Sequence, residues 1–245
     1  MIVISAGMPK SGSGYIFNLM NDLVISSGGS DVRAIKDKYH LENILRHFNC
    51  NVGDLRPATM LKLLAIRLRE RPFVIKTHRR PKTFVKILMR LGIIRSVYIY
   101  RDLRDVLLSS IDHRDNIDRK KHGRSDLKPL SFNDVFPMLP SLFAVWEKWR
   151  RCENALLIKY EDLVKEPVVQ MRRIAEHLNL YVKDEEIRRI IQKYDKNSLD
   201  ASSKSLLHFN KGVVARYREE LSETQRRLFQ EQLGNMLVEM GYPID

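Results

Sequence analysis

Short apolar runs alternate along this chain with longer segments in which apolar residues recur at helical spacing. Four runs rich in β-branched residues are bounded by polar or turn residues, and each predicts a buried strand: 2–5, 73–76, 96–100 and 155–159. Strands that alternate with helices favour a parallel sheet covered by helices on both faces. The pattern therefore predicts an α/β fold with a central parallel β-sheet flanked by helices.

Helices are expected between these strands from apolar spacing and from capping residues. The first begins at Tyr15 and has Leu19, Leu23 and Val24 on its apolar face. The second runs from a cap at Asp54 to about Glu70, with Met60, Leu61, Leu64 and Leu68 facing inward. Further helices are expected over 81–92, 131–149 and 168–180 and from Ser222. Segments 113–130 and 196–212 fit neither period, so they are expected to be long loops. No linker or repeat divides the chain, which predicts one domain over residues 1–245.

Composition places the chain among ordinary globular proteins, with 44% hydrophobic and 30% charged residues. No apolar run approaches the roughly 20 residues that a membrane span needs, and the N-terminus lacks a basic leader. The two cysteines, Cys50 and Cys152, are far apart and have no metal-ligand spacing. These features predict a cytoplasmic protein with reduced thiols.

The net charge of +13 does not by itself identify the class of binding partner. A nucleic-acid surface, a membrane-surface protein and a pocket for small polyanions would each produce it. The basic residues are scattered and no aromatic residues are interleaved with a basic run. Charge alone leaves the three alternatives open.

The first strand runs into a glycine-bearing turn, GMPKSGSGY, that has the form of a phosphate-binding loop. Gly7 and Gly12 have the spacing of a Walker A loop, but Ser13 and Gly14 stand where its lysine and its Mg²⁺ ligand would be. The one lysine, Lys10, lies inside the loop. A strand, a glycine turn and a helix N-terminus make an anion site, while triphosphate chemistry is disfavoured.

Two further strand ends carry side chains suited to anion chemistry. Arg101 follows the third strand, with Ser109 about two helical turns later, and its guanidinium suits an oxyanion; by itself, Arg101 could equally be a surface arginine paired with Asp102 or Asp105. Lys76 and His78 end the second strand and are two residues apart, so they can share a face. A histidine beside cations stays neutral near pH 7 and can accept a proton.

The motifs PKSGSGY, KTH, YRDLRDVLLSS, YEDLVKEP and NKGVVARY, in this order, resemble the sulfotransferases that use 3′-phosphoadenosine 5′-phosphosulfate (PAPS), most closely their cytosolic, small-molecule branch. The resemblance extends from the first strand to about Tyr217. It implies transfer of a sulfuryl group from PAPS to a hydroxyl or amine, with 3′-phosphoadenosine 5′-phosphate (PAP) as product and no metal. The partner it implies is a small acceptor, without nucleic acid or a membrane span.

The same resemblance implies a role for each matching residue. His78 would be the general base, with Lys10 and Lys76 neutralising charge on the leaving group. The nucleotide contacts it implies are Lys10, Ser11, Gly12, Ser13, Gly14, Tyr15, Arg101, Ser109, Tyr160, Asn210, Lys211 and Gly212. In this set Lys10 to Gly14 hold the 5′-phosphosulfate, Tyr15 and Tyr160 meet the adenine, and Arg101 and Ser109 bind the 3′-phosphate.

Two segments depart from the family pattern. Tyr15 replaces the usual tryptophan, and the family segment R-K-G-x-x-G-x-W begins here with Asn210 and lacks its second glycine. Segment 196–212 is nevertheless expected to act as a lid that orders over bound nucleotide. The acceptor is expected to contact the basic, polar stretches 26–38, 77–85 and 113–130, which favours a polar natural product or saccharide. The alternatives are a small-molecule kinase and a non-catalytic module that binds polyanions.

Overall fold

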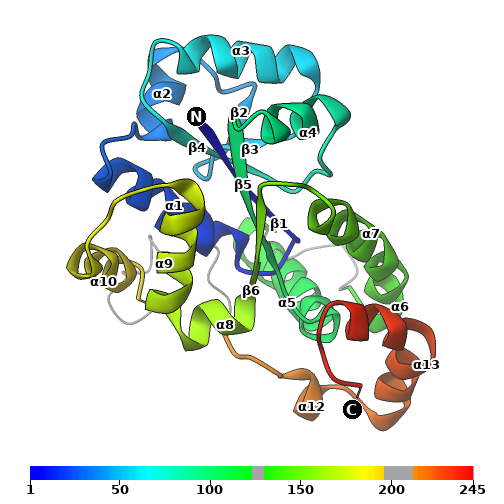
Figure 1. Cartoon of the computed structure of the whole chain (residues 1–245). Coiled ribbons are helices and arrows are strands. Elements are labelled where there is room, and N and C mark those ends of the chain that lie inside the picture. Colours follow the sequence, from blue (N-terminus) through cyan, green and yellow to red (C-terminus); the bar gives the residue numbers. More distant parts are fainter. Residues whose placement is uncertain (123–129, 196–211, 245) are drawn as a thin grey trace. The chain divides into compact units, whose positions relative to one another are not determined.

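The computed structural model describes residues 1–122, 130–195 and 212–244, with the backbone alone for 113–122. The chain packs as two compact units, the first formed by Met1–Tyr100 and Val145–Phe209 and the second by Arg101–Ala144 and Asn210–Asp245 (Figure 1). The expectation of a single domain over 1–245 therefore stays a prediction.

The first unit is built on a six-stranded sheet in the order β2-β3-β4-β1-β5-β6. Its strands are β1 (Ile2–Gly7), β2 (Leu45–Arg46), β3 (Asn51–Val52), β4 (Phe73–Thr77), β5 (Ile94–Tyr100) and β6 (Ala155–Lys159). All neighbouring pairs are parallel except β2 and β3. The predicted α/β class and all four predicted strands are thus confirmed. Every residue of β1 is buried, as expected for a strand with neighbours on both sides.

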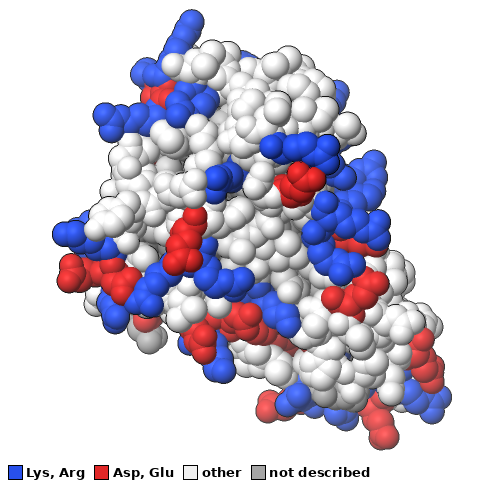
Figure 2. Space-filling view, in the orientation of Figure 1, with Lys and Arg blue, Asp and Glu red and all other residues white. Residues whose placement is uncertain are grey.

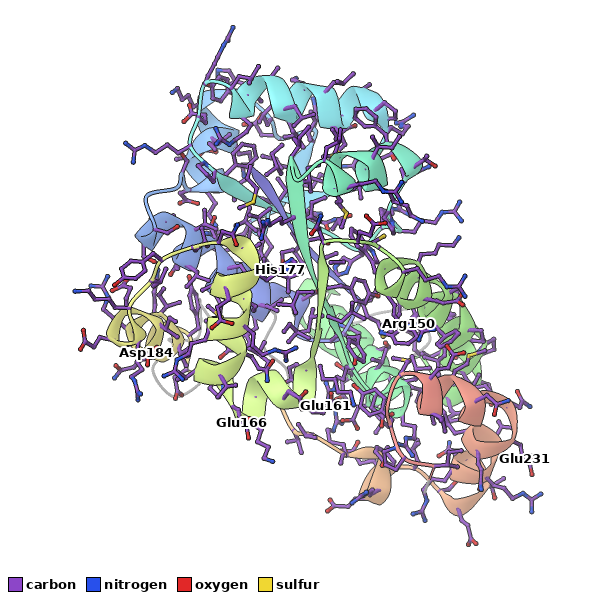
Figure 3. All side chains as sticks on the ribbon, viewed as in Figure 1. Arg150, Glu161, Glu166, His177, Asp184 and Glu231 are labelled. Atoms are coloured by element: carbon purple, nitrogen blue, oxygen red, sulfur yellow. The ribbon has the colours of Figure 1, made fainter. Side chains whose placement is uncertain are left out.

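Helices cover both faces of this sheet. They are α1 (Ser13–Ser26), α2 (Val32–Lys38), α3 (Pro57–Arg67), α4 (Thr83–Arg90), α8 (Tyr160–Lys165), α9 (Pro167–Leu178) and α10 (Asp184–Lys193). In Figure 1, α1, α9 and α10 lie on one side of the sheet and α4 on the other. The strand order explains why α1 and α4 lie on opposite faces. The connection that contains α1 runs from β1 toward β3 and β4, whereas the connection that contains α4 runs the other way, from β4 past β1 to β5. Since parallel crossovers are right-handed, opposite directions place the two helices on opposite faces. Asp184, labelled in Figure 3, ties α10 to α9 through an ion pair with Arg172.

The second unit is helical. It contains α5 (Leu103–His122), α6 (Phe132–Val135), the 3₁₀ turn η1 (Phe136–Met138), the start of α7 (Leu139–Arg150), α12 (Tyr217–Glu220) and α13 (Glu223–Glu239). Phe132, Phe136 and Phe229 form an aromatic cluster with ring centroids 5.0 to 6.0 Å apart. The capping box predicted at Ser222 is confirmed, since its Oγ accepts a hydrogen bond from Gln225 N at 3.3 Å.

Several expectations about the elements were wrong or incomplete. Strands β2 and β3 were missed because two residues show no periodicity. Helix α3 begins at Pro57 rather than near Asp54, and it buries Met60, Leu63 and Ile66, while Leu61 and Leu68 are exposed. Its apolar residues surround the helix, so the neighbours it packs against choose the buried face.

The expected loop over 113–130 was also wrong in its first part. Helix α5 continues to His122, and the many charged residues of 113–122 obscure its helical period in the sequence. Residues 123–129, and 196–211 of the expected lid, lie outside the described residues.

Candidate functional site

The turn between β1 and α1 is shaped by two residues in the left-handed region. Lys10 has φ 67° and Gly12, which caps α1, has φ 74°. Such a conformation costs a non-glycine residue of the order of 1–3 kcal/mol, and strain of this size concentrates at functional sites. The reversal brings the chain directly into the N-terminus of α1, where unpaired backbone N–H groups and the helix dipole favour an anion.

Side chains of the loop hold this shape from inside. The buried hydroxyl of Ser11 donates to the Met8 carbonyl oxygen at 2.6 Å and lies 3.2 Å from that of Ile99. Its proton is therefore used to brace the loop. Asn18, which sequence analysis missed, donates from Nδ2 to the Gly14 carbonyl oxygen at 2.7 Å. The one feature of the sequence that could have indicated Asn18 is its position four residues after Gly14, one helical turn away in α1.

Tyr160, at the start of α8, packs its ring directly on the loop. A Cβ at Gly12 would lie 2.7 Å from Cδ2 and Cε2 of this ring, closer than carbon atoms can approach. Tyr15 of α1 interacts with this ring. Burial raises the pKa of Tyr15 to about 12, with smaller electrostatic contributions from Tyr160 and Asp195. The two tyrosines predicted to meet an adenine therefore come together beside the loop.

Gly12→Ala is expected to destabilise the protein by about 2 kcal/mol or more, through left-handed strain and overpacking together. The destabilisation can be measured by thermal unfolding. Gly92→Ala is the matched control, since Gly92 has φ 70° and nothing within 4 Å of an added Cβ. The control should show the backbone cost alone. Equal effects of the two variants would contradict the importance of the Gly12–Tyr160 contact.

His78 follows β4 and lies against the other end of the loop. Its Nδ1 is 2.7 Å from the Gly7 carbonyl oxygen. A carbonyl oxygen can only accept, so Nδ1 carries the proton and the neutral ring directs its lone pair from Nε2. Burial, then the charge of Lys76, lowers the pKa of His78 to about 4, with smaller contributions from Lys10 and Arg79, against the opposing bond to Gly7. The imidazole is therefore neutral at pH 7 and able to take a proton.

Lys76 is buried on β4, with 6% of its surface exposed. Burial lowers its pKa to about 8, and no carboxylate among the described residues forms an ion pair with it. A bound anion would stabilise the charged form of such a buried ammonium. The charges of Lys76 and Lys10 both lower the pKa of His78, so the structure brings together the three residues predicted to be catalytic.

The chain after β4 is fixed by contacts that sequence analysis did not anticipate. Thr77 Oγ1 donates to the Val52 carbonyl oxygen at 3.0 Å and accepts from Arg79 N at 3.1 Å. Trp149 Nε1 donates to the Arg79 carbonyl oxygen at 3.1 Å. These bonds hold the backbone on both sides of His78. Trp149 is also fully buried and stacks on Tyr98.

In the second unit, Arg101 is organised by Asp105. Arg101 Nη2 donates to Asp105 Oδ2 at 2.9 Å and to the Val213 carbonyl oxygen at 2.6 Å. Asp105 also accepts from the backbone N of Ala215 at 2.9 Å and of Tyr217 at 3.2 Å. Of the pairings considered from sequence, the structure shows Asp105, and it shows a buried pair where a surface one was envisaged. Asp105 thereby attaches the segment 213–217 to the start of α5.

The neighbouring residues complete this arrangement. Asp102 pairs with Arg104 at 2.8 Å, and the Arg104 guanidinium lies 3.6 Å from the Tyr217 ring centroid. Ser109 is buried in α5. Gly212 is exposed, with φ 70°, and Asn210 and Lys211 lie outside the described residues.

Within residues 1–122, 130–195 and 212–244, no group of three His, Cys, Asp or Glu side chains is placed to hold a metal ion. No helix in the same part of the chain is both long and apolar enough to cross a membrane. Cys50 and Cys152 are both free thiols.

Comparison with known proteins decides the family. A family model described as a sulfotransferase domain matches residues 2–241. The chain belongs to the sulfotransferase family. Among curated proteins, cytosolic sulfotransferase 11 of Arabidopsis thaliana is 25% identical over 171 residues, which is 60% of this chain. The match spans only about half (48%) of that relative's length.

Solved structures share the fold. A mouse sulfotransferase, SULT7A1, complexed with PAP superposes with a TM-score of 0.67 at 18% identity, over 96% of this chain and 83% of that one. Retinol dehydratase in a complex with retinol and PAP has a TM-score of 0.64 at 20% identity, over 96% and 81% of the two chains. At these identities the likeness concerns the fold alone.

Proposed function

We propose that this protein transfers a sulfuryl group from PAPS to a hydroxyl or amine of a small polar acceptor, with His78 as general base. The observation that carries the proposal is the geometry of His78. Its Nδ1 is bonded to the Gly7 carbonyl oxygen at 2.7 Å, which leaves Nε2 to accept a proton beside two lysines. Family membership supports the reaction class.

The nucleotide would be held by the residues that match the family motifs. Lys10 and the backbone of Gly12, Ser13 and Gly14 would bind the 5′-phosphosulfate at the helix N-terminus. Tyr15 and Tyr160 would meet the adenine. The presence of PAP in two solved relatives supports this nucleotide.

The 3′-phosphate would be bound by residues of the second unit. Arg101 and Ser109 would be its main contacts, with Asn210, Lys211 and Gly212 contributing from the segment that precedes 213–217. The bond from Arg101 to Asp105 supports this role, since it fixes the guanidinium in advance and lowers the entropy lost on binding.

The reaction would be an in-line transfer. The acceptor oxygen attacks sulfur while Nε2 of His78 removes the acceptor's proton. The bond between sulfur and the bridging phosphate oxygen breaks, and the electron pair leaves with PAP. Lys10 and Lys76 neutralise the charge that develops on that oxygen, which lowers the barrier most in a buried site.

A polar acceptor is favoured by the stretches expected to contact it. Segments 26–38 and 77–85 include α2 and the residues before α4, and both carry several basic side chains. Such a surface suits a saccharide or a polar natural product better than a steroid. A panel of such acceptors with PAPS, compared with simple phenols and steroids, tests this preference.

The cofactor is tested by thermal unfolding with PAP, AMP, ADP and Mg-ATP. PAP at about 100 times its dissociation constant is expected to stabilise the fold by roughly 2.7 kcal/mol, with far less effect of AMP and ADP, which lack the 3′-phosphate. A shift with Mg-ATP alone would instead favour a kinase. No shift with any of the four would favour a non-catalytic polyanion-binding module.

The charge distribution bears on that last alternative. On the face shown in Figure 2, Lys and Arg side chains are spread over many elements with acidic side chains among them. Binding of many polyanions through such a surface would fall steeply with salt and would not distinguish a 3′-phosphorylated adenylate.

Lys76 predicts how PAP binding depends on pH. Its pKa of about 8 in the free protein means that the ammonium loses its proton as pH rises through 8. Bound phosphate favours the charged form, so PAP affinity should fall above pH 8 by up to tenfold per pH unit, with proton uptake on binding. Titration calorimetry in buffers of different ionisation enthalpy measures both. Lys76→Arg, charged throughout this range, should remove this alkaline decline; an unchanged decline would assign it to another group.

A further inference from the structure

Two polar side chains stand beside Lys76 in the sheet and have no role in the proposed mechanism. Lys76 of β4 is in register with Ser5 of β1 on one side and with Asn51 of β3 on the other. Both pairs are parallel, and residues in register in a parallel sheet project to the same face. Ser5, Lys76 and Asn51 therefore form one row across three adjacent strands.

The oxygens at both ends of this row are buried. Ser5 Oγ and Asn51 Oδ1 make no hydrogen bond with any of the described residues. More than about 90% of buried polar groups are hydrogen-bonded, and an unsatisfied one costs about 1–3 kcal/mol. An ammonium has three donors and no acceptor, so it is the chemical complement of two such oxygens.

The next row toward the carboxyl ends of the strands is the site itself. Gly7 and His78 lie two residues beyond Ser5 and Lys76, about 6.6 Å along the strands, and they are joined by the bond from Nδ1. The charge of Lys76 acts on the His78 imidazole. The ammonium is therefore within electrostatic range of the imidazole, and its flexible stem lets it reach either neighbouring oxygen without backbone movement.

We propose that Asn51 and Ser5 are positioning residues, whose side-chain oxygens accept hydrogen bonds from the Lys76 ammonium and hold it toward the phosphosulfate. The inference rests on the proposed function. It assigns to each strand beside β4 a part in orienting the lysine, and it gives a role to two buried oxygens that have no hydrogen-bond partner among the described residues.

Other charged groups near Lys76 lie on elements other than its two neighbouring strands. Neither β1 nor β3 contains a titratable residue. The titratable or charged residues of the loop, of residues 78–82 after β4, of α1, of α2 and of the position directly before β3 are Lys10, His78, Arg79, Arg80, Lys82, Tyr15, Asp22, Arg33, Lys36, Asp37, Lys38 and Cys50. Asp22 is paired with Lys193 of α10. None of these is changed by substituting Asn51 or Ser5.

The test compares two near-isosteric variants of Asn51. Asn51→Leu removes the acceptor, so the pH at which PAP affinity begins to fall should move down by about half a unit or more, and kcat should fall several-fold. Asn51→Asp adds an opposite charge, which should move that pH up by about one unit or more. Opposite shifts from two substitutions of one shape are not expected from a packing role. Ser5→Ala should shift the pH in the direction of Asn51→Leu, and it keeps the test open if Asn51→Leu does not fold.

Ser96→Ala is the matched control. Ser96 is a buried serine of the same sheet, but it is in register with Ile4 and so projects to the opposite face. It should leave the pH dependence unchanged. If the Asn51 and Ser5 variants fold, bind PAP and keep the wild-type pH dependence, the inference is wrong. If the wild-type protein binds no PAP, the proposed function itself fails; if it binds PAP without an alkaline decline, only the inference does.

Discussion

Replacing His78 with Ala is expected to lower the rate of sulfuryl transfer by about 10²- to 10⁴-fold, the usual contribution of a general base. Binding of PAP should change little, because the ring contacts the Gly7 carbonyl oxygen and no proposed nucleotide-binding side chain. The measurement is kcat with saturating PAPS and acceptor, together with the dissociation constant of PAP. Full activity of the variant would show that another group removes the proton.

His177→Ala is the control for this variant. His177 is also a partly buried histidine bonded to a backbone carbonyl oxygen, that of Ser96 at 3.0 Å, and it lies on α9 (Figure 3). Loss of this ring removes a comparable structural contact without removing the proposed base, so kcat should stay near that of the wild type.

The pH dependence gives a second test of the base. The pKa of His78 is about 4 in the free protein, because burial and nearby cations disfavour the imidazolium. Activity therefore depends on a ring that stays neutral as pH falls from 7 toward this value. Bound phosphosulfate is anionic and raises the pKa, so the acid limb of kcat should lie at higher pH than the limb seen in kcat/KM for PAPS.

Replacing Asp105 with Ala is expected to destabilise the protein by about 3–5 kcal/mol, as for other buried ion pairs that lose one partner. The carboxylate is fully buried and accepts from Arg101, Ala215 N and Tyr217 N, so its loss leaves a buried guanidinium and two backbone N–H groups without these acceptors. Denaturant unfolding measures the change. A loss below about 1 kcal/mol would show that solvent or other groups replace the carboxylate.

An exposed ion pair supplies the comparison for Asp105. Glu153 pairs with Arg90 at 2.9 Å, but both side chains are more than 60% exposed. Glu153→Ala should cost less than about 1 kcal/mol, because water screens the pair and replaces its partner.

The elements that depend on local pattern could be predicted from the sequence. The four longer strands, α1 and the capping box at Ser222 were predicted and are present. A run of apolar residues indicates a strand buried on both faces, and a cap depends on residues three apart, so both can be recognised within a short stretch of sequence. The motif KTH and the loop PKSGSGY identified Lys10, Lys76 and His78 as a group, and the structure brings the three together.

Features that depend on distant partners could not be predicted. The buried face of α3 was misplaced because several of its faces carry apolar residues and the packing partners choose among them. The contacts of the Ser11 hydroxyl with the carbonyl oxygens of Met8 and Ile99 could not be predicted either, since Ile99 lies on another strand. The pKa values of Lys76 and His78 likewise follow from burial, which no short motif contains.

The sequence by itself determined the α/β order of elements and the chemical groups available at the strand ends, since periodicity and side-chain chemistry are local properties. Only the tertiary structure decided which atoms those groups meet. The bond from His78 Nδ1 to Gly7, the ring of Tyr160 on Gly12 and the row of Ser5, Lys76 and Asn51 each join segments far apart in the chain. Strand order and register set these contacts, because they determine which residues stand side by side.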